Sequence, residues 1–222
     1  MFWNYFVPHF CPNLAKRMRA RKACRLTIEM LEDRSVPSHG GSVEASTLVD
    51  NGPAANRVDI VFLGDGYAAA DIDTNYPLHI ATALKHLFNE GEDPFPRYRN
   101  FFNVYRVDVI STDSGIDDPS EGIFKNTALD AAYDCAGIDR LICINNSTAD
   151  SFLEHAPAPV DIRLITVNST QYGGSGGSYA VYAGGDSASA AIALHELGHT
   201  FNQLADEYSY FNGSTYSGTE PS

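Results

Sequence analysis

The segment with the clearest chemical potential is His-Glu-Leu-Gly-His at residues 195–199. His195 and His199 are four residues apart, and positions i and i+4 of an α-helix lie on one face, so both imidazoles can bind a single ion. Glu196 directly follows the first histidine and can act as general base on a water at that ion. This HExxH pattern is typical of zinc hydrolases, so we predict Zn²⁺ as the cofactor and metal-assisted hydrolysis as the chemistry.

A zinc ion held by two histidines needs a third protein ligand and leaves a fourth position open to water. Asp206 lies seven residues after His199, a rise of about 10.5 Å on a continuous helix, which is too far to share an ion. The helix must therefore end near Asn202, a residue type that tolerates the left-handed conformation of a helix C-cap. We favour Asp206 as the third ligand. Glu207 and Glu220 are the alternative ligands. The competing interpretation is that this acidic segment is a solvated turn that binds no metal.

The helix that carries the motif needs a buried face and a defined start. Apolar side chains recur at positions 194, 197, 201 and 204, at spacings of three, four and three, which predicts a buried stripe beside the histidines. Asp186 and Ser187 precede an alanine-rich turn and are candidate N-caps.

Upstream of the motif, strand-like and helical segments follow one another. Residues 58–63 form a buried-type strand, residues 68–89 a helix, and residues 101–110, 140–144 and 161–167 further strands. Residues 178–183 are expected to form a short edge strand that can bind an extended peptide through main-chain hydrogen bonds, with a flexible connector as the alternative. We expect an α/β protein of the α+β type, with a mixed twisted sheet, a backing helix and the active-site helix.

Longer stretches around these elements resemble one protein family. Residues 195–208, HELGHTFNQLADEY, are similar to the signature of the IgA peptidase family of bacterial zinc metallopeptidases, in which HExxH is followed by Leu-x-Asp-Glu-Tyr. Residues 56–67, NRVDIVFLGDGY, resemble the start of that family's catalytic domain, and residues 172–177 resemble its loop before the helix. The resemblance spans residues 56–220 and implies a zincin-like endopeptidase that cleaves a protein or peptide. It does not imply immunoglobulin A as the substrate.

One family feature is missing from the sequence. Zincins often place a methionine-containing turn beneath the metal, whereas the methionines here are Met1, Met18 and Met30. We therefore expect that this turn is absent or lies beyond Ser222, and that the catalytic domain is truncated at its C-terminus.

The first 38 residues differ in character from the rest of the chain. Residues 1–34 contain seven Lys or Arg and three acidic residues, a net charge of +4, whereas the remainder contains eight against 25, a net charge of −17. No apolar segment typical of a signal peptide follows the basic cluster, but Leu-Glu-Asp-Arg-Ser-Val-Pro at 31–37 resembles a leader motif of exported bacterial proteins. The alternative interpretation of these 38 residues is a short amphipathic helix with a disordered tether. We predict a basic leader at 1–38, a linker with one short strand at 39–56 and a C-terminally truncated catalytic domain at 57–222, in an extracellular or cell-surface protein.

Composition narrows the possible partners. The chain has 222 residues and a net charge of −13, which argues against nucleic acid as a partner. It contains no apolar run of about 18 residues that would span a membrane. Cys135 and Cys143 are eight residues apart, a spacing that fits either a small disulfide loop or a free thiol in a buried strand.

Two other functions fit the same motif. Another HExxH hydrolase, such as an aminopeptidase or an amidase, would show a closed pocket instead of an open cleft. An inactive zinc-binding surface protein would result if the support beneath the metal were missing.

Overall fold

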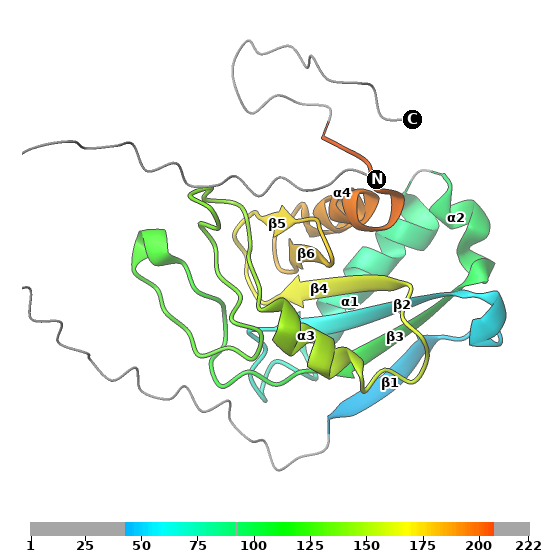
Figure 1. Ribbon diagram of the computed structural model, residues 1–222, viewed down its shortest axis with the longest axis horizontal. Coiled ribbons are helices and arrows are strands. Elements are labelled where there is room, and N and C mark those ends of the chain that lie inside the picture. Colours follow the sequence, from blue (N-terminus) through cyan, green and yellow to red (C-terminus); the bar gives the residue numbers. More distant parts are fainter. Residues whose placement is uncertain (1–42, 92, 207–222) are drawn as a thin grey trace, which may run out of the picture. The chain divides into compact units, whose positions relative to one another are not determined.

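The computed structural model describes residues 43–91 and 93–206. Its centre is a six-stranded mixed sheet with the strand order β1-β3-β2-β4-β6-β5 (Figure 1). The strands are β1 (Glu44–Val49), β2 (Val58–Asp65), β3 (Phe102–Asp108), β4 (Ile162–Val167), β5 (Gly174–Ser175) and β6 (Ala180–Ala183). The four inner strands are parallel to one another, and β1 and β5 pair antiparallel at the two edges. The predicted α+β class with a mixed sheet is confirmed.

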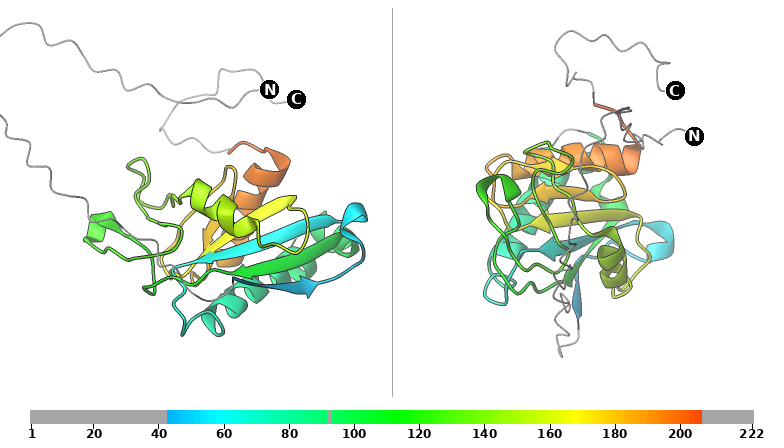
Figure 2. Two further views of the ribbon diagram at one scale, coloured as in Figure 1. Left: turned by 60° about the horizontal axis from the view of Figure 1, so that its bottom comes forward. Right: turned by 60° about the vertical axis from the view of Figure 1, so that its left-hand side comes forward.

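Helices cover both faces of the sheet (Figure 2). The α-helices are α1 (Asn75–Lys85), α2 (Phe95–Tyr98), α3 (Asn146–Leu153) and α4 (Ser189–Asn202). A π-helical turn, η2 (His86–Glu90), continues α1, and the 3-10 turns are η1 (Ala54–Asn56), η3 (Arg99–Phe101) and η4 (Pro119–Glu121). Helices α1, α2 and α4 pack on one face and α3 on the other. Among the described residues, no helix has the length and apolar character to cross a membrane.

The central strand β2 shows how the sequence specifies two layers. Ile60 and Phe62 pack into the core cluster on the α1 and α4 side, while Val61 and Leu63 pack into the cluster on the α3 side. All four side chains are at most 1% exposed. Successive side chains of a strand point to opposite faces, so a parallel strand covered on both sides is apolar at every position.

A buried carboxylate at the end of β2 holds the long connection between β3 and α3. Asp65 is 0% exposed and accepts hydrogen bonds from the Ser111 hydroxyl and from the N–H groups of Leu129 and Ala131, at 2.9–3.0 Å. The Ser111 oxygen in turn accepts from the N–H of Gly66 at 2.9 Å. Buried backbone donors need partners, so this carboxylate fixes the loop to the sheet.

The start of the domain differs from the predicted elements at one helix boundary. Strand β1 lies in the range predicted as a linker with one short strand, and because it pairs with β3 the sheet begins before residue 57. The backing helix begins at Asn75 instead of residue 68, since residues 68–74 form hydrogen-bonded turns in which the Ala68 carbonyl accepts from Asp71 and Ile72. The predicted leader at residues 1–38 lies outside the described residues.

Two predicted strands are also corrected. Residues 140–144 do not form a strand, because a disulfide joins Cys135 and Cys143 and the enclosed loop makes only isolated bridges, one of them between Leu141 and Gly174. Residues 178–183 are not an edge strand either. They contain β6, which lies between β4 and β5, so its backbone has neighbours on both sides and the predicted pairing with a substrate is wrong.

Candidate metal centre

Helix α4 carries the HExxH motif and is anchored by its buried face. Ile192, Ala193 and Leu197 are 1–6% exposed and belong to the core cluster that includes α1 and the sheet. The predicted apolar stripe is only partly correct: Phe201 is 41% exposed, and Leu204, 60% exposed, lies beyond the helix end. The N-cap is Ala188, which has no side-chain cap, so the predicted N-caps Asp186 and Ser187 are wrong. Asp186 instead holds the turn before the helix, where its carboxylate accepts the N–H of Ala188 at 2.8 Å.

Three predicted ligand atoms lie together on the outer side of this helix. The Nε2 atoms of His195 and His199 are 3.1 Å apart, and each is 3.2 Å from the Oδ1 atom of Asp206. The two imidazole rings are edge to face, with an interplanar angle of 87°. The structure therefore brings together two side chains from one face of α4 and one from the segment that follows it.

The spacing and chemistry of these atoms fit a metal ion. In a tetrahedral zinc site with bonds of about 2.0–2.1 Å, neighbouring ligand atoms are about 3.3 Å apart, close to the three distances seen here. Imidazole nitrogens and a carboxylate oxygen are the ligand types that zinc uses in catalytic sites. Three electron-rich atoms at 3.1–3.2 Å repel one another unless a cation or a proton lies between them.

A hydrogen bond behind His199 sets the orientation of its ring. Nδ1 of His199 lies 2.7 Å from the carbonyl oxygen of Leu204 and donates to it as N–H, which leaves Nε2 as the metal-binding nitrogen. Sequence reasoning missed this contact, because a main-chain carbonyl has no signature in the sequence.

The chain reversal that returns Asp206 to the helix occurs one residue later than predicted. Asn202 is the last helical residue, and Gln203 is the C-cap with a left-handed conformation at φ 56°. The N–H of Leu204 bonds to the carbonyl of Gly198 at 3.1 Å, which closes the turn. The alternative ligands Glu207 and Glu220 lie outside the described residues.

Glu196 occupies a different environment from the two histidines. It is 8% exposed, and its carboxylate lies within 4.8 Å of ligand atoms of both histidines, so it is close enough to act on a group bound by them. Burial raises the pKa of Glu196 to about 7, and the charge of Asp206 adds to this effect, while His199 and Arg140 oppose it. A carboxyl group with a pKa near neutrality can both accept and release a proton. The approach of Arg140 to this site was not apparent from the sequence.

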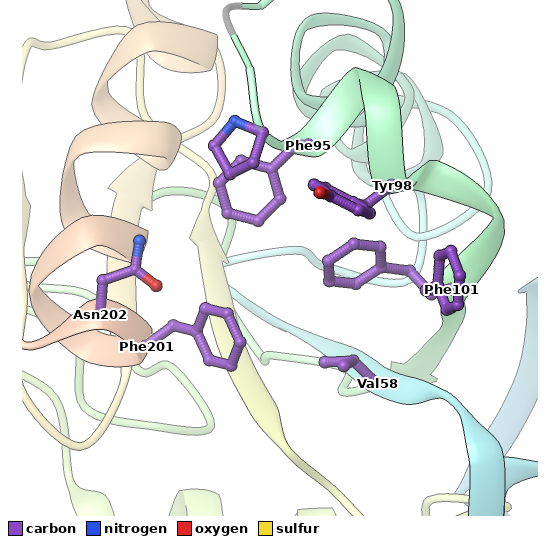
Figure 3. A pocket seen from close by; sticks show the side chains of 8 residues that line it. Val58, Phe95, Tyr98, Phe101, Phe201 and Asn202 are labelled. Atoms are coloured by element: carbon purple, nitrogen blue, oxygen red, sulfur yellow. The ribbon is translucent and has the colours of Figure 1, made fainter.

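A separate aromatic pocket of about 350 Å³ lies between the end of α4 and the α2 region (Figure 3). Its lining residues are Val58, Pro94, Phe95, Tyr98, Phe101, Phe102, Phe201 and Asn202. The lining contains neither a carboxylate nor an imidazole, so we place the chemistry at the histidine cluster and not at this pocket.

Comparison with known proteins identifies the family to which the chain belongs. No match is found among curated proteins. The family model described as IgA Peptidase M64 matches residues 46–221, a span that contains most of β1, strands β2 to β6, helix α4 and the clustered side chains. The match covers more than half of the chain, and this protein therefore belongs to the IgA peptidase M64 family, a family of peptidases.

Proposed function

We propose that this protein is a zinc-dependent endopeptidase in which His195, His199 and Asp206 hold the metal and Glu196 is the general base. The observation that carries the proposal is the triangle of ligand atoms at 3.1–3.2 Å beside a buried carboxyl group. Membership in a peptidase family supports peptide bonds as the substrate.

The protein's own residues have separate tasks in this proposal. Zinc, when bound, supplies Lewis acidity and lowers the pKa of a coordinated water towards neutrality. Glu196 accepts the proton of the attacking water, holds it on its carboxyl group and donates it to the amine nitrogen of the leaving product. Leu204 keeps His199 in the tautomer that presents Nε2, because its carbonyl accepts the Nδ1 hydrogen.

Exposure of the site favours cleavage within a chain over cleavage at its end. The His195 side chain is 44% exposed, and those of His199 and Asp206 are each 20% exposed. An open site admits a polypeptide that continues in both directions, whereas an aminopeptidase needs a closed end that holds the substrate terminus.

Export is part of the same proposal. The disulfide between Cys135 and Cys143 supports it, since structural disulfides persist in oxidising compartments and are rare in the cytosol. The basic leader at residues 1–38 stays a prediction from the sequence.

The experiment that tests the function separates metal binding from chemistry. We expect about one zinc per chain by elemental analysis, since the proposed site offers one set of three ligand atoms. Glu196→Gln should retain that zinc and lose peptidase activity on a mixed peptide library by about 10²–10⁴-fold, the range for removal of a general base. His199→Ala should lose both. Glu154→Gln, at an exposed carboxylate after α3, is the matched control and should behave as wild type.

Two results would contradict the proposal. If the protein contained less than a tenth of an equivalent of zinc and added zinc did not raise this content, the proposed metal site would be wrong. If Glu196→Gln retained most of the activity, the assignment of Glu196 as general base would be wrong.

A further inference from the structure

The short edge strand β5 lies directly against the motif-bearing side of α4. Its main chain is held on both sides: it pairs with β6, and the Gly174 N–H donates to the Arg140 carbonyl at 3.1 Å. The Ile142 N–H bonds back to the Gly174 carbonyl at 3.4 Å. The strand therefore cannot move away from α4 without breaking bonds to two neighbouring segments.

The side-chain positions of this segment alternate between two surroundings. A β-carbon built at Gly173 would lie 2.6 Å from the Arg140 carbonyl oxygen, and the Ser175 hydroxyl donates to the Ile142 carbonyl at 2.6 Å, so both positions face the disulfide loop. Gly174 and Gly176 face the opposite way, towards α4. This is the period of two expected of an extended chain.

Both glycines that face α4 contact residues of the proposed site. A β-carbon at Gly174 would lie 2.8 Å from Oε1 of Glu196. A β-carbon at Gly176 would lie 2.5 Å from Cβ of His199 and 3.0 Å from its ring carbons. These distances are shorter than van der Waals contact, for which carbon pairs need about 3.5–4.0 Å.

Backbone conformation does not account for glycine at these two positions. Among the described residues, the glycines with a left-handed φ are Gly52, Gly66, Gly115, Gly122 and Gly137, and neither Gly174 nor Gly176 is one of them. An alanine could adopt the local φ and ψ, so the requirement for glycine comes from occupied space. At position 174 that space is taken by the Ile192 methyl group, Oε1 of Glu196 and the Val181 carbonyl oxygen, and at position 176 by His199.

From these contacts we propose that Gly174 and Gly176 are positioning residues, Gly174 acting through the Glu196 carboxyl group and Gly176 through the His199 ring. The inference rests on the proposed function, because it assigns Glu196 to proton transfer and His199 to the metal. The two glycines let a strand pack against the helix at backbone distance while the carboxyl group and the imidazole keep their places.

The two positions should affect different steps. Alanine at 174 must displace the Glu196 carboxyl group by several tenths of an ångström, so we expect kcat to fall by about tenfold or more, with KM and zinc affinity changed by less than about threefold. Alanine at 176 must displace the His199 ring, so we expect the zinc dissociation constant to rise by about 10–100-fold. This is the range found when a residue that orients a metal ligand is mutated.

The experiment compares four alanine variants of the 222-residue chain. Gly174→Ala and Gly176→Ala are the test variants, and Gly177→Ala is the open-space control because a β-carbon there meets nothing within 4 Å. Gly173→Ala is the control for general strain, since its β-carbon contacts the disulfide loop and not α4. Each is measured for kcat, KM, zinc affinity by chelator competition, zinc-free thermal midpoint and the visible spectrum of the cobalt-substituted protein.

The expected pattern is specific to each variant. Gly174→Ala loses kcat with an unchanged cobalt spectrum, Gly176→Ala loses metal affinity with an altered spectrum, and Gly173→Ala lowers the thermal midpoint while it keeps kcat and zinc affinity. Glu196→Asp withdraws the carboxyl group from β5, so adding Gly174→Ala to it should cost less kcat than adding it to wild type.

A second variant covers the case in which Gly174→Ala does not fold. Its β-carbon would also lie 2.7 Å from the Ile192 methyl group Cγ2, so Gly174→Ala with Ile192→Ala removes that contact and keeps the one with Glu196. The same selective loss of kcat is expected, relative to Ile192→Ala alone.

The outcomes separate this inference from the proposed function. Wild-type protein with zinc and activity, combined with test variants that match Gly177→Ala, would overturn the inference alone. Gly173→Ala with equal losses of kcat and zinc affinity would also overturn it, because general strain would then explain the effect. Wild-type protein without zinc or activity would overturn the proposed function and this inference with it.

Discussion

Replacement of Asp206 by alanine is the sharpest test of the proposed ligand set. Asp206 supplies the only carboxylate oxygen within 3.2 Å of both histidine Nε2 atoms in the described part of the chain. Its removal leaves two imidazoles on α4 and no carboxylate from the described part of the segment after the helix. The helix and its buried face should stay intact, because Asp206 lies four residues beyond the last helical residue, Asn202.

The size of the effect follows from the number of ligands. Four-ligand zinc sites have binding free energies of about 10–16 kcal/mol, or about 3 kcal/mol for each ligand. A loss of about 3 kcal/mol corresponds to a rise of about 100-fold in the zinc dissociation constant, since 1.4 kcal/mol is a factor of ten. We therefore expect Asp206→Ala to bind zinc about 100-fold more weakly and to lose activity at limiting zinc.

Chelator competition at fixed pH measures this change, and activity during zinc titration shows whether excess metal restores the reaction. Asp73→Ala, at an exposed acidic residue before α1, is the control for loss of one negative charge. Glu207→Ala should leave zinc affinity near the wild-type value. A larger effect from Glu207→Ala than from Asp206→Ala would assign the third ligand to Glu207. No effect from Asp206→Ala would refute the proposed site of His195, His199 and Asp206.

Two further predictions concern the support of the fold. Asp65→Asn should lower the free energy of unfolding by about 2–5 kcal/mol in urea titrations, because an amide nitrogen would face one of the two backbone N–H donors and leave buried groups unpaired; an unchanged value would show that the loop has other anchors. Burial lowers the pKa of His79, which hydrogen-bonds to the Tyr67 hydroxyl at 2.7 Å, although the charge of Asp71 opposes the shift. The unfolded state therefore binds more protons at His79 than the folded state does. The stability that neutral, buried His79 contributes is present above its unfolded pKa of 6.5 and is lost as the pH falls below that value. In zinc-free protein His79→Gln should flatten the decline in thermal midpoint below pH 6.5, and a parallel decline in both proteins would rule out His79 as its source.

Local sequence patterns predicted the elements whose structure depends on their own residues. The apolar runs of β2, β3 and β4 specify strands because nearly every side chain is buried on one face or the other. The run at residues 140–144 was indistinguishable from these by pattern. It was mispredicted because its conformation depends on Cys135, to which Cys143 is bonded, and on contact with β5, and neither is local.

Within the site, too, some features follow from local sequence and others depend on distant contacts. The four-residue spacing of His195 and His199 was enough to predict that their side chains share a face, since helix geometry fixes this without any distant contact. Family resemblance extended this to a peptidase, and the matched family agrees. The residue type at 206 indicated a possible ligand, but whether its carboxylate reaches the histidines depends on the direction of the chain after the helix.

Only the tertiary structure decided the parts of the site that come from separate segments. The left-handed turn at Gln203 brings Asp206 within 3.2 Å of both histidines, and β5 packs its glycines against Glu196 and His199. Such contacts depend on how a helix, an edge strand and a disulfide loop pack together. The sequence codes for residue types and local conformation, whereas the distances between these segments are set by burial and hydrogen bonding across the whole sheet.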